Sequence, residues 1–218
     1  IRTPAASTGL FGLKPSRGRQ PQGPRSGDHW FGFAVEHAVT RSVRDSAALL
    51  DLTAGALPGS SFQLSKPSVP YLEDMNFAPH RLRLALTRSP VVSRHLHPDC
   101  LAALDASAKR LSDLGHEVIL SEPPLVGDDF IFHYVRLLAA DTAATLADLE
   151  LTVGRRAKRD EIEPRTWALI HMGRAITGEE LVTSQWSMQK ICRDYAEWAN
   201  GFDVVVSAAL GSPPLAIG

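Results

Sequence analysis

The pattern that most constrains the fold lies near the middle of the chain, where a strand, a helix and a second strand follow one another. Apolar residues recur at strand spacing over Leu82–Leu86, and a second strand pattern covers Glu117–Leu120. Between them Pro98 begins a helical repeat that Gly115 ends, with one apolar face at Leu101, Leu104, Ala108 and Leu111. Strands joined by such a helix lie parallel in a β-α-β unit. The chain is therefore predicted to have an α/β fold.

A third strand is predicted over Asp203–Ser207. This short run of β-branched residues is bounded by Gly201 and by the Gly211–Pro214 turn, as expected for a strand buried on both faces. We expect the strand over Leu82–Leu86 to lie between this one and Glu117–Leu120, with all three parallel.

Two sequence signatures mark the starts of helices. Ser42 and Asp45 have the spacing of a capping box and predict a helix over 42–53. Thr177 and Glu180 repeat that spacing before a second amphipathic segment. Both helices are expected to begin at these hydroxyl residues.

The connections indicate how the chain is organised. A short helix at Arg2–Thr8 is followed by Gly- and Pro-rich turns up to residue 32, and residues 58–79 mix Pro, Ser and Gly with little periodicity. We interpret this second stretch as a connection between a first part, residues 1–77, and a second part, residues 78–218.

Composition excludes several classes of function. The 23 basic and 24 acidic residues nearly cancel, so nucleic-acid binding is not expected. No apolar run reaches the roughly 18 residues that span a bilayer. Cys100 and Cys192 have no metal-site spacing and suit a reducing compartment, so a cytoplasmic location is expected. The sequence indicates no oligomeric state.

Common catalytic and cofactor motifs are missing. Leu13 and Pro15 break the P-loop spacing within Gly9–Ser16, and neither His-Glu-x-x-His nor Gly-x-Ser-x-Gly occurs. His95 and His97 flank a helix start, where a capping or surface role is favoured over a metal ligand. No metal or cofactor is expected.

Aromatic residues on the predicted helices are the candidates for a substrate pocket. Asp128 is expected to cap a mostly apolar helix through Leu149, which carries Phe130 and Tyr134. These two residues and Trp167 could line a pocket for an apolar substrate, although aromatics at helical spacing more often pack in the core.

Several stretches together resemble a known family. They are Ile1–Ala6, Gly9–Arg19, Thr40–Leu50 and, near the end of the chain, Phe202–Val206. In this order they resemble the amidase-signature family. The resemblance implies a mixed, largely parallel sheet flanked by helices, and hydrolysis of a small-molecule carboxamide at its C–N bond without a cofactor.

The resemblance also implies where the chemistry occurs. In the family a Gly-Gly-Ser directly precedes the stretch matched by Ile1 and Arg2, and this serine attacks the amide with help from a second serine and a lysine further upstream. The triad is thus expected before Ile1, in a longer protein, and the chain alone is expected to be inactive. Five residues of the family motifs lie within the chain and are expected to have a structural role: Arg2, Gly12, Lys14, Arg41 and Asp45.

One departure and two alternatives qualify this interpretation. Many members have Gly-Pro before the segment matched by Arg41–Asp45, whereas this chain has Glu36–Thr40, which resembles a subgroup that includes nylon-oligomer cyclic-dimer hydrolases. The alternatives are an amidotransferase-type subunit that supplies ammonia and a non-catalytic binding module.

Overall fold

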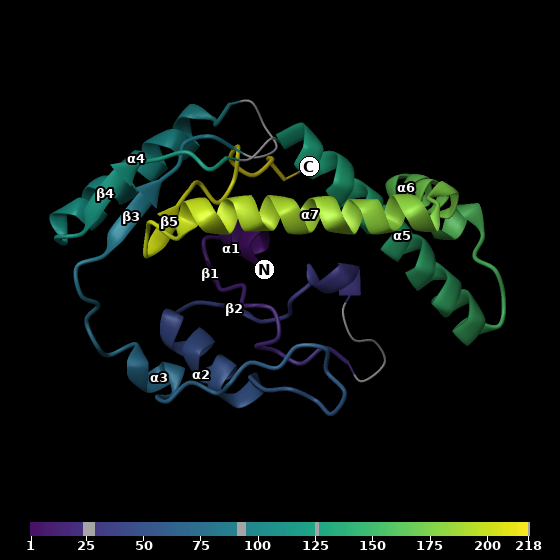
Figure 1. Ribbon diagram of the computed structural model, residues 1–218, viewed down its shortest axis with the longest axis horizontal. Helices are drawn as coiled ribbons and strands as arrows, with labels where there is room; N and C mark the ends of the chain where they lie inside the picture. Colours follow the sequence, from purple (N-terminus) through teal and green to yellow (C-terminus); the bar gives the residue numbers. More distant parts are fainter. Residues whose placement is uncertain (24–28, 91–94, 125–126, 218) are drawn as a thin grey trace. The chain divides into compact units, whose positions relative to one another are not determined.

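The computed structural model describes residues 1–23, 29–90, 95–124 and 127–217 (Figure 1). They form two compact units, one of Ile1–Pro123 with Ala199–Gly218 and the other of Pro124–Trp198. The division predicted at residue 78 falls inside the first unit and stays a prediction. Along these ranges, no helix is both long enough and apolar enough to cross a membrane.

The first unit begins with a helix that folds back on a short strand. Its opening elements are α1 (Arg2–Thr8), β1 (Phe11–Gly12), the 3-10 helix η1 (His29–Gly32), β2 (Val39–Thr40), α2 (Val43–Thr53) and α3 (Tyr71–Asp74). Gly9 ends α1 in the left-handed conformation, with φ 66°. β1 and β2 then pair antiparallel. The helix predicted at Arg2–Thr8 is confirmed.

The remaining elements of the first unit form the predicted parallel sheet (Figure 1). β3 (Arg83–Leu86) lies between β4 (Glu117–Leu120) and β5 (Val204–Val206), and both pairings are parallel. α4 (Pro98–Asp113) joins β3 to β4. The α/β fold and the order of the three strands are confirmed. Because β3 is the central strand, three of its side chains are buried, namely Leu84, Ala85 and Leu86.

Helix starts follow the predicted capping chemistry with one difference. The backbone amide of Asp45 donates to Ser42 Oγ at 3.1 Å. Glu180 and Thr177 make both bonds of a capping box, at 2.9 and 3.2 Å. At Ser42 the described bond is the hydroxyl half alone, since Asp45 is one methylene shorter than the glutamate of a full box. The cap of α4 is His97, whose Nδ1 accepts the amide of Asp99.

The second unit is helical. It contains α5 (Gly127–Val153), the 3-10 helix η2 (Arg159–Glu161), α6 (Pro164–Ala175) and nearly all of α7 (Gly178–Ala199). α5 begins before Asp128, so this residue lies in the first turn and is not the predicted cap. An acidic residue still suits that position, because a first-turn carboxylate interacts favourably with the helix dipole.

Contacts within the second unit differ between its two helix pairs. Ala143, Leu146 and Ile170 form a buried cluster between α5 and α6. Polar contacts join α5 to α7, since Arg136 pairs with Glu180 at 2.6 Å and His133 bonds the buried Ser184 at 3.2 Å.

Candidate functional site

The family motif at the start of the chain depends on a close approach at Gly12. A Cβ atom added there would lie 2.6 Å from Ala5 Cβ and 2.9 Å from the Ile1 carbonyl oxygen. Only glycine allows β1 to run this close beneath α1. Ala5, on the other side of the contact, is 3% exposed. The packing therefore fixes the backbone directly after Ile1.

Lys14 lies in the same part of the motif and donates a hydrogen bond. Its Nζ lies 2.7 Å from the backbone carbonyl oxygen of Pro15. Partial burial lowers the pKa of Lys14, and the positive charges of Arg2 and Arg17 lower it further. The structure thus brings Arg2, Gly12 and Lys14 together around α1 and the turn that follows β1.

Arg41 and Asp45 reach this region through the pairing of β1 with β2. Phe11 opposes Thr40, so the second motif stretch begins beside the first. Arg41 and Asp45 are themselves exposed, at the start of α2. A structural role for these two residues stays a prediction.

Sequence reasoning missed a polar contact that anchors α2. His37 Nε2 lies 2.9 Å from Ser46 Oγ, and Ser46 is fully buried. His37 belongs to the segment where this chain departs from the usual Gly-Pro. The sequence could have indicated this contact only through that departure, because the imidazole of His37 replaces residues that have no side chain able to bond the buried hydroxyl of Ser46.

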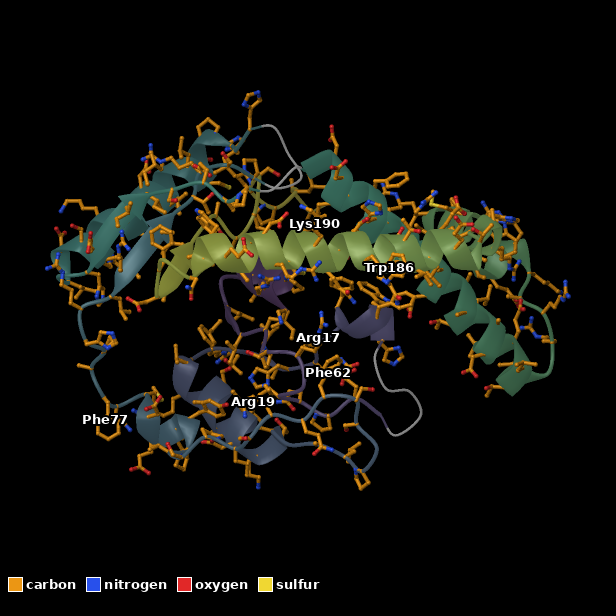
Figure 2. All side chains as sticks on the ribbon, in the orientation of Figure 1. Arg17, Arg19, Phe62, Phe77, Trp186 and Lys190 are labelled. Carbon is orange, nitrogen blue, oxygen red and sulfur yellow. The ribbon has the colours of Figure 1, made fainter. Side chains whose placement is uncertain are left out.

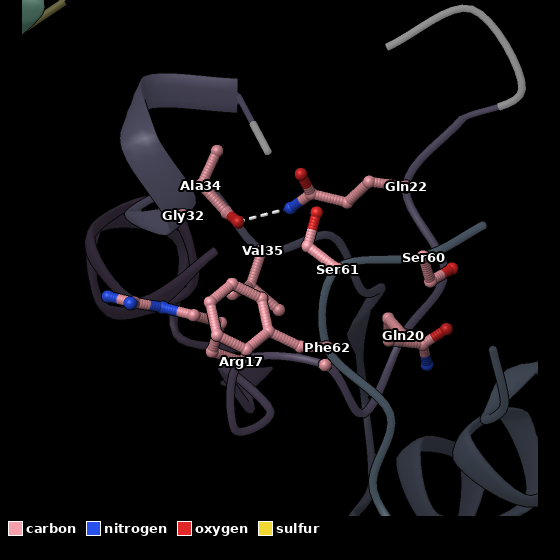
Figure 3. A pocket seen from close by; sticks show the side chains of 10 residues that line it. Arg17, Gln20, Gln22, Gly32, Ala34, Val35, Ser60, Ser61 and Phe62 are labelled. Carbon is pink, nitrogen blue, oxygen red and sulfur yellow. Dashed lines mark hydrogen bonds between the residues drawn. The ribbon is translucent and has the colours of Figure 1, made fainter. Parts of the chain in front are cut away.

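A small pocket opens between the Gly-rich stretch and the connection around Phe62 (Figure 3). Its volume is about 30 Å³ and its lining includes Arg17, Gln22, Ala34 and Phe62. The Gln22 carboxamide donates to the Ala34 carbonyl oxygen, and the ring of Phe62 lies beside the Arg17 side chain (Figures 2 and 3). A pocket of this size accommodates about one or two water molecules. It is too small for an amide substrate.

The backbone next to this pocket is strained. Trp30 and Phe31 have φ values of 52° and 56°, in the left-handed region that disfavours residues with a side chain. Gly32 follows at φ 80°, and an added Cβ there would meet the Arg17 side chain at 3.0 Å. This left-handed turn therefore packs directly against Arg17, which also lies 5.6 Å from the ring centre of Phe33.

The aromatic candidates separate into two groups, with Phe130 and Tyr134 on α5 and Trp167 on α6. Phe130 and Tyr134 stack, with ring centres 5.7 Å apart. Trp167 packs instead against the cluster that contains Ala143, and its ring meets His171 edge-on at 5.2 Å. Ala143 lies nine residues beyond Tyr134, about 14 Å along the helix. A substrate-binding role for the three residues stays a prediction.

The ionisable residues described give no metal site, since no three His, Cys, Asp or Glu side chains gather in a ligand arrangement. His97, one of the two histidines weighed in the sequence, is a helix cap.

Comparison with known proteins identifies the family. The family model for amidases matches residues 1–218. The chain belongs to the amidase family. The resemblance on the motif residues is thereby confirmed, and so is the α/β fold of this amidase-family chain.

Curated relatives match almost the whole amidase-family chain but extend well beyond it. The 6-aminohexanoate-cyclic-dimer hydrolases of Pseudomonas sp. (strain NK87) and Paenarthrobacter ureafaciens are each 32% identical over 211 residues, which are 94% of this chain and 43% of theirs. A putative amidase, AmiB2, of Mycobacterium tuberculosis is 29% identical over 223 residues. The chain thus spans less than half the length of the curated relatives it matches.

Solved structures agree with this assignment. A 6-aminohexanoate cyclic dimer hydrolase complexed with substrate superposes with a TM-score of 0.86 at 31% identity, over 93% of this chain and 43% of that one. A bacterial aryl acylamidase superposes at 0.82 with 20% identity, over 99% of this chain and 44% of that one. At this lower identity the likeness shows the fold alone.

Proposed function

We propose that the protein containing this chain hydrolyses a carboxamide C–N bond through a covalent acyl-enzyme. The observation that carries the proposal is the 32% identity to 6-aminohexanoate-cyclic-dimer hydrolases over 94% of the chain. In the proposed mechanism a serine directly before Ile1 attacks the amide carbon, while a lysine and a second serine upstream remove its proton. The amine leaves with a proton, and water then hydrolyses the ester.

The residues of this chain support the reaction by positioning. A nucleophile directly before Ile1 would precede the backbone that Gly12 and Ala5 hold in close contact. Rigid placement of a nucleophile matters because small displacements of reacting atoms reduce the rate strongly.

The proposed substrate is a small-molecule amide, and the cyclic dimer of 6-aminohexanoate is the first compound to test. The relatives at 32% identity are named for that compound, and the Glu36–Thr40 departure resembles the subgroup that includes such hydrolases. No cofactor is required. The reaction needs only amide and water.

The test uses a serine-reactive fluorophosphonate and a panel of amides on the full-length protein. We expect stoichiometric labelling at the serine directly before Ile1, and turnover of at least one of the cyclic dimer, its linear counterpart, an anilide and an aliphatic amide. The 218-residue chain alone should show neither. Labelling of that chain, or a label at another serine, would contradict the proposed position of the nucleophile.

A second experiment tests the role of Lys14. Its ammonium group donates to the Pro15 carbonyl oxygen, so we propose that it stabilises the turn and takes no proton from the nucleophile. Lys14→Met in the full-length protein should leave kcat within about threefold, whereas loss of a triad base costs about 10³-fold or more. A loss of that size, with the folded structure retained, would assign Lys14 to the chemistry.

A further inference from the structure

A pocket of the second unit is lined by residues at the end of α5 and in the segment that follows. The chain turns back there towards α6 (Figure 1). The volume of the pocket is about 340 Å³. This falls within the range of about 300–1,000 Å³ that is usual for small-molecule sites. The pocket is formed by α5, the following turn, η2 and Ile162, so it belongs to this unit alone.

The apolar wall of the pocket is one face of α5. Leu146, Leu149 and Val153 lie at spacings of three and four residues, and Ala157 and Ile162 complete the wall. Leu149 and Val153 are more than half exposed. Leu146 belongs to the buried cluster, and Ala157 and Ile162 pack against this cluster, so the floor of the pocket is continuous with the core of the unit.

The charged groups around this wall are already paired. Arg155 makes two bonds to the carboxylate of Glu161, both at 2.8 Å. The Glu150 carboxylate accepts the amide of Ala157 at 2.9 Å and lies 3.9 Å from Arg174. Glu150 is mostly buried, with a side chain 17% exposed. A charged ligand would have to lose solvation without gaining an unpaired counter-charge from these groups.

We propose that this pocket binds a neutral organic molecule with an apolar body about the size of a phenylalkyl group. The volume accommodates such a body, the aliphatic wall supplies the contact surface, and the paired rim selects against a net charge. The site is a property of the second unit and does not depend on the proposed amide hydrolysis.

The test compares three probes with the same apolar body: 4-phenylbutanol, 4-phenylbutyrate and 4-phenylbutylammonium. None contains an amide, so binding is measured without turnover. By ligand-observed NMR and calorimetry on the full-length protein, we expect 4-phenylbutanol to bind saturably with a Kd below about 1 mM. The two charged probes should bind at least about fivefold more weakly.

Variants locate the site. Val153→Asp places a charge in the wall and Ala157→Leu fills the pocket without one, and each should weaken 4-phenylbutanol binding about tenfold or more. The matched control is Leu151→Asp, because Leu151 lies on the same helix, is 82% exposed and is not part of the lining. It should leave the Kd within about twofold. Circular dichroism and thermal unfolding establish that each variant folds.

Three results would overturn the proposal. One is the lack of saturable 4-phenylbutanol binding, and another is equal or tighter binding of a charged probe. The third is the same affinity in folded Ala157→Leu and wild-type protein. If a second copy of the chain covers this wall instead, sedimentation should show a dimer that Val153→Asp dissociates and that 4-phenylbutanol does not affect.

Discussion

At the scale of single residues, Gly12 has the tightest packing in the N-terminal motif. Its hydrogen occupies the place where any side chain would meet Ala5 Cβ at 2.6 Å and the Ile1 carbonyl oxygen at 2.9 Å. Neither neighbour is the end of a flexible side chain, so neither can rotate away. The glycine is required here by a close approach of backbone to helix.

Gly12→Ala should therefore lower the free energy of unfolding by about 1–3 kcal/mol, the usual cost of overpacking. Urea denaturation measures the change. The control is Gly178→Ala, at the first residue of α7, where an added Cβ meets nothing within 4 Å. An unchanged midpoint and slope for Gly12→Ala would show that α1 and β1 separate easily.

Glu122 is a second residue whose role follows from its partners. Its carboxylate accepts the Thr87 hydroxyl and the amides of Arg88, at 2.9 Å, and Ser89, at 3.1 Å. Burial alone would raise the pKa of Glu122, but these hydrogen bonds outweigh burial and lower it from 4.5. The residue thereby links the carboxyl ends of β3 and β4.

Because the folded-state pKa is lowered, the stability from Glu122 is present above pH 4.5 and is lost as pH falls through the lowered value. Glu122→Gln should cost about 1 kcal/mol at pH 7, and the difference from wild type should shrink below pH 4.5. Urea titrations at pH 7, 5 and 3 measure this. Glu117→Gln, at the other end of β4, is the control. If the difference in unfolding free energy between Glu122→Gln and wild type stayed constant with pH, the stability would not depend on the charge of Glu122.

At the scale of elements, the pairing of α5 with α6 depends on one small residue. A Cβ atom added to Gly173 would lie 2.0 Å from the Ala139 carbonyl oxygen and 2.9 Å from Ala143 Cβ. Ala139 is fully buried and Ala143 is 9% exposed. Helices in contact through such small residues approach closely, so the contact tolerates no added methyl group without a shift of one helix.

Gly173→Ala should destabilise the second unit by about 2 kcal/mol or more, although alanine in an exposed helix would stabilise by up to about 1 kcal/mol. The sign of the change in unfolding free energy therefore distinguishes the effect of packing from that of helix propensity. Gly178→Ala, which adds the same methyl group in open space, should be neutral or slightly stabilising. Thermal unfolding monitored by circular dichroism compares the two, and a stabilised Gly173→Ala variant would refute the close helix contact.

At the scale of the whole molecule, residues far apart in sequence join the strands β3 and β5 of the first unit. Arg83 donates its amide to Asp203 Oδ2 at 2.7 Å, and Asp203 donates its amide to the Arg83 carbonyl oxygen at 2.8 Å. The whole second unit lies between these two residues in the chain. Each unit still has its own buried side chains, with Leu84 in the first and Ile170 in the second.

Leu84→Ala should therefore cost about 2–5 kcal/mol and should act mainly on the first unit. Hydrogen exchange should accelerate at the amides of β3, β4 and β5, and the α5–α6 pair should keep its protection. Leu215→Ala, at a side chain that is 95% exposed, is the control. Equal acceleration in both units would show that they unfold together.

The sequence by itself determined the local structure and the family of this protein. Apolar spacing and a proline start indicated the β-α-β unit, hydroxyl residues indicated the helix caps, and the ordered motifs indicated the amidase family. These features are readable because their causes lie within a few residues of one another. Even the parallel position of β5 followed from its run of β-branched residues. The burial expected on both faces of that strand is wrong, because Val204 at its start is 44% exposed and the next two valines are only partly buried.

Only the tertiary structure decided which distant groups meet. It placed His37 against Ser46, Glu122 at the ends of two strands and Gly173 against Ala139. It also separated Trp167 from the stack of Phe130 and Tyr134, which share the apolar character that grouped all three in the sequence. Apolar character favours the packing of a side chain against others, whereas the neighbour that it contacts depends on how whole helices and strands pack.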